Sequence, residues 1–384
     1  MGREPAIVGV GATPYYYRGQ SEPQTVYELI GKAVLAAVAD AGLRIGDVDG
    51  LVFYAHGFEP GLIAEQLGIP ELNFSATVAA QGGGSAGILD LAAMAIETGR
   101  ASTVVCLGAC QQSERRYGLS LANVAATPDS VWHKASGLKG PGHALALLAR
   151  RHMHKFGTRR EAFAEVVMSS RAYAETRPTA LRRKPLTLDE YMAAPMLADP
   201  LCRLDFCLET DGALAFVVTS AERARDLAQR PVHIAASAHG GSGEWGRAFF
   251  SLNMPDDLFT TAGGEHTARR LYAKAGIGPA DIDVALLYDH FSPLVIMQLE
   301  DYGFCARGEG GAFVESGAIR PGGAIPVNPH GGHLSEAYVI GMTHIREAVE
   351  QLRGVAVNQV ADAQFAVVTG GPAPIPMSGA ILRN

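Results

Sequence analysis

Residues 41–54 read Ala-Gly-Leu-Arg-Ile-Gly-Asp-Val-Asp-Gly-Leu-Val-Phe-Tyr, and residues 275–288 read Ala-Gly-Ile-Gly-Pro-Ala-Asp-Ile-Asp-Val-Ala-Leu-Leu-Tyr. The two stretches align without a gap. Each predicts a helix end capped by glycine, an Asp-rich turn and then a buried strand. Because one pattern occurs twice, the chain of 384 residues is expected to contain the same half twice.

Two further pairs of segments follow in the same order. Gly83–Gly87 and Gly331–Ser335 each combine a glycine turn with the start of a predicted helix, which in the second half continues through Ile345. Val104–Gly108 and Val367–Gly371 both read as buried strands that end in glycine. These pairs extend the predicted repeat over most of each half.

The order of the elements predicts an α/β fold. Short apolar runs alternate with amphipathic segments such as Val26–Val38 and Arg160–Glu175. This alternation predicts two duplicated βαβ-type halves, residues 1–230 and 231–384, with mixed, mostly parallel sheets. Between about residues 111 and 200 the strand signal lapses. We interpret that stretch as an inserted loop or cap domain, a usual place for ligand contacts.

The composition narrows the class of protein. A net charge of −7 and a pI near 6.0 argue against nucleic acid or an anionic membrane as a partner. The five cysteines contain no CxxC pair, which predicts reduced thiols, and no metal-ligand spacing is present. The chain opens without a leader-like segment and contains no apolar stretch fit to span a bilayer. We therefore expect a cytoplasmic globular protein that binds no metal.

Two glycine turns are candidate sites for a developing oxyanion. Residues 328–341 read Asn-Pro-His-Gly-Gly-His-Leu-Ser-Glu-Ala-Tyr-Val-Ile-Gly, which predicts a strand end, a tight turn and a helix. Backbone N–H groups and a helix N-terminus would converge there on a carbonyl or thioester oxygen. Residues 82–87, Gly-Gly-Gly-Ser-Ala-Gly, offer a similar turn in the first half. The residues predicted to bind this oxygen are Gly83, Gly84, Ser85, Gly332 and Gly371.

These motifs resemble those of the thiolase superfamily. The segment at 328–341 is similar to the family pattern Asn-Pro-x-Gly-Gly-x-x-Ser-x-Gly-His-Pro-x-Gly. Three other segments match in the family's order: residues 7–15 resemble the first strand of sterol-carrier-protein-type thiolases, residues 204–215 the Asp-Gly-Ala segment, and residues 368–372 the last glycine turn. The resemblance covers essentially the whole chain, and it implies the thiolase fold and a homodimer.

The departures from the thiolase pattern indicate a different reaction. Gly84 stands where the family carries its nucleophilic cysteine, and Tyr338 stands at its catalytic histidine. Tyr288-Asp289-His290-Phe291 occupies the place of His-Asp-Cys-Phe, so that another histidine has become Tyr288. Without the cysteine thiol no acyl-enzyme can form by the usual route.

Two tyrosines without the cysteine resemble one branch of the superfamily, the aldolases that shorten steroid side chains. That resemblance implies retro-aldol cleavage of a β-hydroxyacyl-CoA with a bulky hydrophobic acyl chain. It also implies a small partner protein with a zinc finger and an OB-fold. Coenzyme A would then be part of the substrate, with no permanently bound cofactor.

The resemblance also implies roles for individual residues. Tyr288 is predicted to be the base and Tyr338 the proton donor, although the two roles could be exchanged. A phenol titrates near about 10, so the base would need neighbours that lower its pKa. His290 and His333 flank the same predicted pocket and could orient a tyrosine or the thioester. The basic run Arg182, Arg183 and Lys184 is a candidate site for the phosphates of coenzyme A.

Two other functions stay open at this stage. The chain could be a β-ketoacyl-CoA thiolase or acyltransferase with an atypical site, in which CoA attacks directly or another thiol replaces the missing one. It could also be a non-catalytic acyl-CoA-binding subunit of a larger complex. Tyr54 is the repeat counterpart of Tyr288, so a tyrosine at this strand end could serve packing alone.

Overall fold

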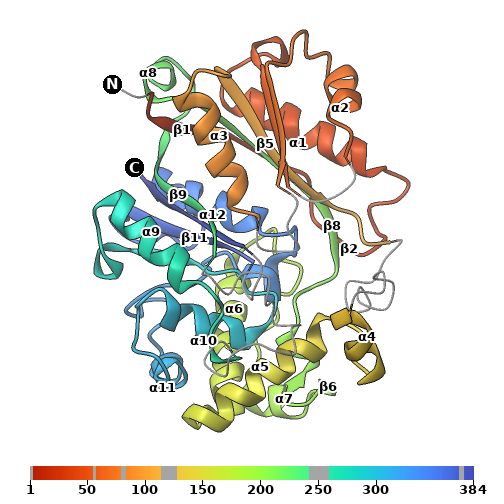
Figure 1. Cartoon of the computed structure of the whole chain (residues 1–384), viewed down its shortest axis with the longest axis vertical. Coiled ribbons are helices and arrows are strands. Elements are labelled where there is room, and N and C mark those ends of the chain that lie inside the picture. The colour runs from red at the N-terminus through yellow and green to blue at the C-terminus, as the bar shows by residue number, and fades with distance from the viewer. Residues whose placement is uncertain (1–2, 55–57, 79–83, 114–127, 242–258, 372–375) are drawn as a thin grey trace.

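Most strands join one mixed sheet. The computed structural model describes residues 3–54, 58–78, 84–113, 128–241, 259–371 and 376–384. The main sheet has the order β10-β11-β12-β9-β1-β8-β5-β3-β4, with β2 paired to β8 (Figure 1). Its strands are β1 Pro5–Ala12, β2 Tyr16–Tyr17, β3 Gly50–Tyr54, β4 Phe74–Val78, β5 Thr103–Cys110, β8 Thr210–Ser220, β9 Val232–Gly240, β10 Val284–Leu286, β11 Phe365–Gly370 and β12 Met377–Arg383.

The sheet has the same strand order on both sides of the β1–β9 pair. Outward from that pair, β1, β8, β5 and β3 on one side correspond to β9, β12, β11 and β10 on the other. The β3–β5 and β10–β11 pairs are parallel, whereas β5–β8 and β11–β12 are antiparallel. The predicted mixed α/β fold with a duplicated unit is therefore confirmed.

The Asp-rich turns explain why the repeated sequence forms the same arrangement of neighbouring strands in both halves. In the first half, Asp49 Oδ1 accepts a hydrogen bond from the backbone N–H of Thr103 at 2.8 Å. In the second half, Asp283 Oδ2 accepts one from Phe365 at 2.9 Å. Thr103 and Phe365 begin β5 and β11, so each carboxylate aligns its own strand with the parallel neighbour.

The helices begin close to where the sequence predicts. The predicted helix Val26–Val38 is α1 Val26–Asp40, and Thr25 and Glu28 form a reciprocal capping box at its start. The predicted helix Arg160–Glu175 is α6 Arg160–Thr176. The other α-helices are α2 Pro60–Leu67, α3 Gly87–Glu97, α4 Pro128–Ala135, α5 Pro141–Phe156, α7 Leu188–Met192, α8 Ala221–Ala224, α9 Glu265–Ala275, α10 Ser292–Asp301, α11 Gly310–Glu315 and α12 Met342–Arg353.

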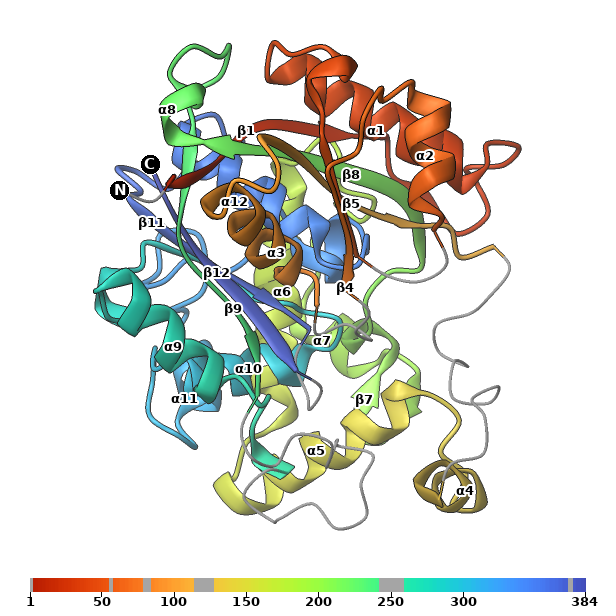
Figure 2. The ribbon, with the colours of Figure 1, turned by 45° about the horizontal axis from the view of Figure 1, so that its top comes forward.

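Helices α3 and α12 form a central layer that strands of both halves cover (Figure 2). One apolar cluster joins Ile88 of α3 and Ile345 of α12 to Val104 of the first half and Val368 of the second. Helix α1 packs on another face, against β1 and β8. The segment that carries Tyr338 enters this central layer directly before α12, so its backbone lies in the protein interior.

A third group of elements lies between β5 and β8 in the sequence. Its described part contains α4 to α7 and the small hairpin β6 Met196–Ala198 with β7 Leu201–Cys202. Helix α6 packs against α10, α11 and the turn Gly332–Glu336. The division into residues 1–230, 231–384 and a cap at about 111–200 stays a prediction. No helix of the described ranges is both long and apolar enough to cross a membrane.

Candidate active site

Two buried tyrosines meet in the interior. Tyr288 follows β10, and Tyr338 lies in the segment before α12, 50 positions further along the chain. Their hydroxyl oxygens are 3.1 Å apart, within hydrogen-bond distance. The side chains are only 1% and 4% exposed, and the rings meet edge to face. The geometry thus joins two proton-carrying groups in a site shielded from bulk water.

The backbone of each tyrosine is held by polar side chains from other elements. The N–H of Tyr288 donates to Thr369 Oγ1 at 2.8 Å, and its carbonyl accepts from Gln298 Nε2 at 3.0 Å. The carbonyl of Tyr338 accepts a 2.6 Å hydrogen bond from Thr210 Oγ1. Because Thr210 begins β8 and Thr369 belongs to β11, strands of both halves position the pair.

Asp289 connects the two tyrosine-bearing segments. Its carboxylate follows Tyr288 directly and accepts hydrogen bonds from the backbone N–H groups of His333 at 2.8 Å and Leu334 at 3.3 Å. His344 Nε2 lies 3.1 Å from the same carboxylate. Asp289 is 1% exposed, so these donors replace the water that an anion requires. The residue therefore braces the turn.

The sequence predicted a helix from Gly331 onward, and this predicted start is wrong. Residues Gly332–Glu336 form a single π-type turn, Ala337 is extended, and α12 begins only at Met342. The carbonyls of Ser335 and Glu336, which a continuing helix would use, instead accept hydrogen bonds from the backbone N–H groups of Arg182 and Leu181, both at 3.0 Å. Tyr338 consequently points from an extended segment and not from a helix.

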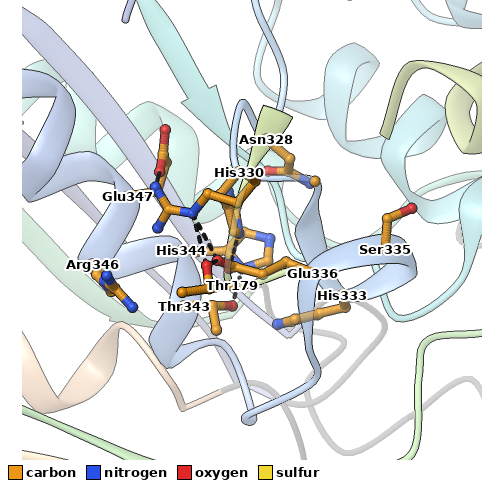
Figure 3. Close-up of polar contacts among 12 residues, drawn as sticks. Thr179, Asn328, His330, His333, Ser335, Glu336, Thr343, His344, Arg346 and Glu347 are labelled. Atoms are coloured by element: carbon orange, nitrogen blue, oxygen red, sulfur yellow. Dashed lines mark hydrogen bonds and ion pairs between the residues drawn. The ribbon is translucent and has the colours of Figure 1, made fainter. Parts of the chain in front are cut away.

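Three histidines, His290, His333 and His344, lie against the Tyr288 ring, and His330 lies behind them against His344. The ring centroids of His290 and His333 lie 5.1 and 4.5 Å from that of Tyr288. Burial lowers the pKa of His290 to about 3 and the pKa values of His330 and His333 well below their ordinary value. Figure 3 shows His330, His333 and His344 grouped around the turn. At neutral pH His290, His330 and His333 are uncharged and could donate or accept a hydrogen bond.

One aspartate and two histidines of this site have metal-ligating atoms close together. The donor atoms of Asp289, His333 and His344 lie within 4.8 Å of one another. However, His344 Nε2 is 2.9 Å from the carbonyl of Leu287, and a carbonyl only accepts, so this nitrogen carries a proton. The ring nitrogens of His333 have no hydrogen-bond partner among the described residues, and its Nδ1 lies 3.4 Å from Asp289. His344 would have to give up its contact with Leu287 before it could ligate an ion.

The glycine turns meet beside Tyr288. Ser85 precedes α3, and its buried hydroxyl lies where a β-carbon on Gly341 or Gly370 would come within 2.6 or 2.7 Å of it. A β-carbon on Gly341 would also lie 2.9 Å from the Tyr288 ring. Ser85 is therefore close to Tyr288, and its predicted role in binding the thioester oxygen stays a prediction. Gly341 and Gly370 are contributors that we did not single out, although both belong to the quoted glycine motifs.

The remaining predicted glycines and the predicted CoA-binding residues do not form one group. Gly83 is outside the described residues, Gly84 is buried before α3, and Gly371 follows β11. Gly332 lies against Asp289. In the basic run, the backbone of Arg182 contacts the turn, whereas Arg183 and Lys184 are exposed, with Lys184 Nζ 3.5 Å from a carboxylate oxygen of Glu190. A role of this run in CoA binding stays a prediction.

The comparisons with known proteins agree with this architecture. Residues 248–380 match the model of the thiolase C-terminal domain-like family. A steroid side-chain-cleaving aldolase from Thermomonospora curvata is 41% identical, over 98% of this chain and 97% of the relative. This chain belongs to the thiolase superfamily. A second superfamily member, 17-hydroxy-3-oxo-4-pregnene-20-carboxyl-CoA lyase from Mycobacterium tuberculosis, is also 41% identical and covers 98% of each chain. A solved structure, the Ltp2-ChsH2(DUF35) aldolase, superposes with a TM-score of 0.91 at 38% identity, covering 100% of this chain and 98% of that one.

No cysteine of this thiolase-superfamily chain is activated as a nucleophile. All five cysteines lie within the described ranges and are free thiols. Burial raises the pKa of Cys110 to about 11 and that of Cys305 to about 12, and it also raises the pKa of Cys106, Cys202 and Cys207. Thiolate chemistry needs the opposite shift. None of the five cysteines therefore has the lowered pKa of a reactive thiol, and the placement of Gly84 at the family's cysteine position stays a prediction.

Proposed function

We propose that this chain is a thiolase-fold aldolase that cleaves the Cα–Cβ bond of a β-hydroxyacyl-CoA with a bulky hydrophobic acyl chain, such as a steroid side chain. The observation that carries the proposal is the buried pair of phenols, 3.1 Å apart, in a site without an activated thiol. The names of the relatives from Thermomonospora curvata and Mycobacterium tuberculosis support the same reaction class.

The chemistry needs a base, an electron sink and an acid. Tyr288, as phenolate, removes the proton of the β-hydroxyl group, and the β-carbon becomes the carbonyl of a ketone or aldehyde. The electron pair of the breaking Cα–Cβ bond moves into the thioester, which becomes an enolate. Tyr338 then protonates Cα and releases the shortened acyl-CoA. Because the two hydroxyls share a hydrogen bond, the proton taken up by one can return to the other without solvent.

The enolate oxygen requires donors in a site that excludes water. The turn before α3 supplies them in our proposal, because Ser85 Oγ is buried without a hydrogen-bond partner among the described residues. It lies close to the Tyr288 ring, where the thioester has to bind for the tyrosine to reach the β-hydroxyl. His290 and His333, uncharged and buried, orient the phenols or the thioester from the opposite side.

The assembly is part of the proposal. The name of the superposed Ltp2-ChsH2(DUF35) aldolase supports a DUF35 partner. We propose that this partner is the small zinc-finger and OB-fold protein that the resemblance implies. We further propose a cytoplasmic homodimer that takes its coenzyme A with the substrate and holds no permanent cofactor. Arg182, Arg183 and Lys184 are proposed to attract the phosphates of that coenzyme A.

A product assay on the purified chain, alone and with a DUF35 partner, tests the proposal. A β-hydroxyacyl-CoA is supplied with and without free CoA, and the ketone or aldehyde and the shortened acyl-CoA are quantified. Release of both products without free CoA is expected. Cleavage of the β-keto analogue that depends on CoA would instead establish a thiolase. Tight binding without turnover, even beside the partner, would establish a silent subunit.

A further inference from the structure

A buried ionic cluster lies directly behind the segment that carries Tyr338. Arg177, at the C-terminal end of α6, is 2% exposed. Its guanidinium group lies 2.9 Å from Glu336, 3.3 Å from Glu347 and 2.7 Å from Glu350. Glu336 belongs to the turn, only two residues before Tyr338, while the other two carboxylates come from α12. One side chain from outside the active site thus ties the turn to α12.

Arg177 is the central cation of this cluster. Burial alone would lower its pKa, but the three carboxylates outweigh burial and raise it, so the guanidinium stays charged. Arg346 neutralises the outer side, where it pairs with Glu350 at 2.6 Å and donates to the Tyr15 hydroxyl at 3.2 Å. Glu347 has its pKa raised to about 7, chiefly by burial. Without Arg177, Glu336 and Glu347 would lose their cationic partner in an interior that penalises unpaired charge strongly, while Glu350 would keep Arg346.

The same region of the chain holds the rest of the turn. Thr179 Oγ1 donates to the Glu336 carboxylate at 2.6 Å, and Figure 3 shows these two side chains next to each other. Ser170 Oγ donates to the carbonyl of Gly331, and the N–H of Leu181 donates to that of Glu336. Asp289 holds the opposite edge of the turn through backbone N–H groups. The turn is thus clamped from two sides.

We propose that Arg177 is a positioning residue, which fixes the Tyr338 hydroxyl against Tyr288 by clamping Glu336 to α12. Arg177 is not a catalytic residue, because it touches Glu336 and α12 and not the reacting atoms. Ala337 is extended, and Tyr338 follows it before α12 begins at Met342, so no helix holds Tyr338 and its placement depends on where Glu336 is anchored. The inference rests on the proposed aldolase reaction.

The test compares Arg177→Lys with Arg320→Lys in the full chain. Arg320 pairs with Glu165 on the same helix α6 but does not contact the turn, which makes it a matched control. In Arg177→Lys we expect kcat to fall about 10- to 100-fold with an almost unchanged KM, because a small misplacement of a reacting group is costly. The kcat of Arg177→Gln should be lower than that of Arg177→Lys, because lysine keeps the positive charge and glutamine does not. Arg320→Lys should keep its kcat.

Hydrogen exchange gives a readout that does not depend on the reaction. The amides of residues 331–341 should exchange at least about tenfold faster in Arg177→Lys than in the wild type or Arg320→Lys, because their anchor is loosened. The proposal would be overturned if Arg177→Lys changed neither the exchange rates nor kcat. It would also be overturned if Arg177→Lys and Arg320→Lys lost kcat equally. If Arg177→Lys fails to fold, Thr179→Val removes one bond to Glu336 while every charge is kept, and it should lower kcat several-fold. If the wild type shows no turnover, the aldolase function is refuted. The hydrogen-exchange data would still show whether Arg177 anchors the turn.

Discussion

The carboxylate of Asp289 occupies the space that a side chain on Gly332 would need. A β-carbon built on Gly332 overlaps Asp289 Oδ2, and the residue has a φ of 59°, in the left-handed region. Glycine is therefore required twice at this position, once for its backbone conformation and once for the close approach of the anion. This contact brings the segment that carries Tyr338 onto the strand end that carries Tyr288.

Gly332→Ala should consequently disturb the site more than backbone strain alone explains. We expect turnover to fall at least about 100-fold, because the turn has to move away from Asp289. Gly354→Ala is the matched control: it has a similar φ of 77° but no atom within 4 Å of the added carbon. That variant should lose only about 1–2 kcal/mol of stability and keep its kcat. Equal kcat losses in the two variants, with thermal unfolding measured beside them, would contradict the role of the contact.

Removing either phenol hydroxyl should abolish most of the activity without unfolding the protein. Tyr288→Phe and Tyr338→Phe keep the buried rings, and each is expected to lower kcat by about 10²- to 10⁴-fold, the range typical of a lost general acid or base. Tyr302→Phe serves as a control, since Tyr302 is equally buried and its hydroxyl has no hydrogen-bond partner among the described residues. Near-normal turnover in both Tyr288→Phe and Tyr338→Phe would contradict the proposed mechanism.

The thiols should be dispensable and slow to react. With a pKa of about 11, Cys110 is thiolate in only about one molecule in a thousand at pH 8. Iodoacetamide should therefore modify the folded protein far more slowly than free cysteine. Cys110→Ala and Cys207→Ala should retain turnover of the β-hydroxyacyl-CoA. Loss of activity on substitution, together with a trapped acyl group found by mass spectrometry, would point to a thiolase route.

Acidification should destabilise the fold through its buried histidines. The pKa of His290 is lowered from 6.5 to about 3 in the folded state, so below pH 6.5 the unfolded chain binds the additional proton. Stability is therefore lost as the pH falls, by up to about 1.4 kcal/mol per pH unit for this one group. His290→Asn should lose less stability than the wild type between pH 7 and pH 5 in denaturant titrations. Exposed His154→Asn should behave like the wild type.

Much of the fold follows from local patterns in the sequence. The repeat at residues 41–54 and 275–288 specifies two turns whose Asp49 and Asp283 carboxylates make equivalent bonds, and the strand order is duplicated accordingly. The amphipathic pattern also predicts α1 and α6 closely. The glycine turn at Gly331 misled us, because a local reading expects a helix there. The N–H groups of Leu181 and Arg182, distant in sequence, occupy the carbonyls that this helix would use.

The sequence by itself determined which chemical groups are present: Tyr288 and Tyr338 next to glycine-rich motifs, and acidic residues on both sides of Tyr338. Only the tertiary structure decided that Tyr288 and Tyr338, 50 positions apart, bring their hydroxyls within 3.1 Å. It likewise decided that Arg177 reaches Glu336. The physical reason is that local sequence governs backbone conformation over a few residues, whereas the distance between remote side chains depends on how whole elements pack and where buried charges find partners.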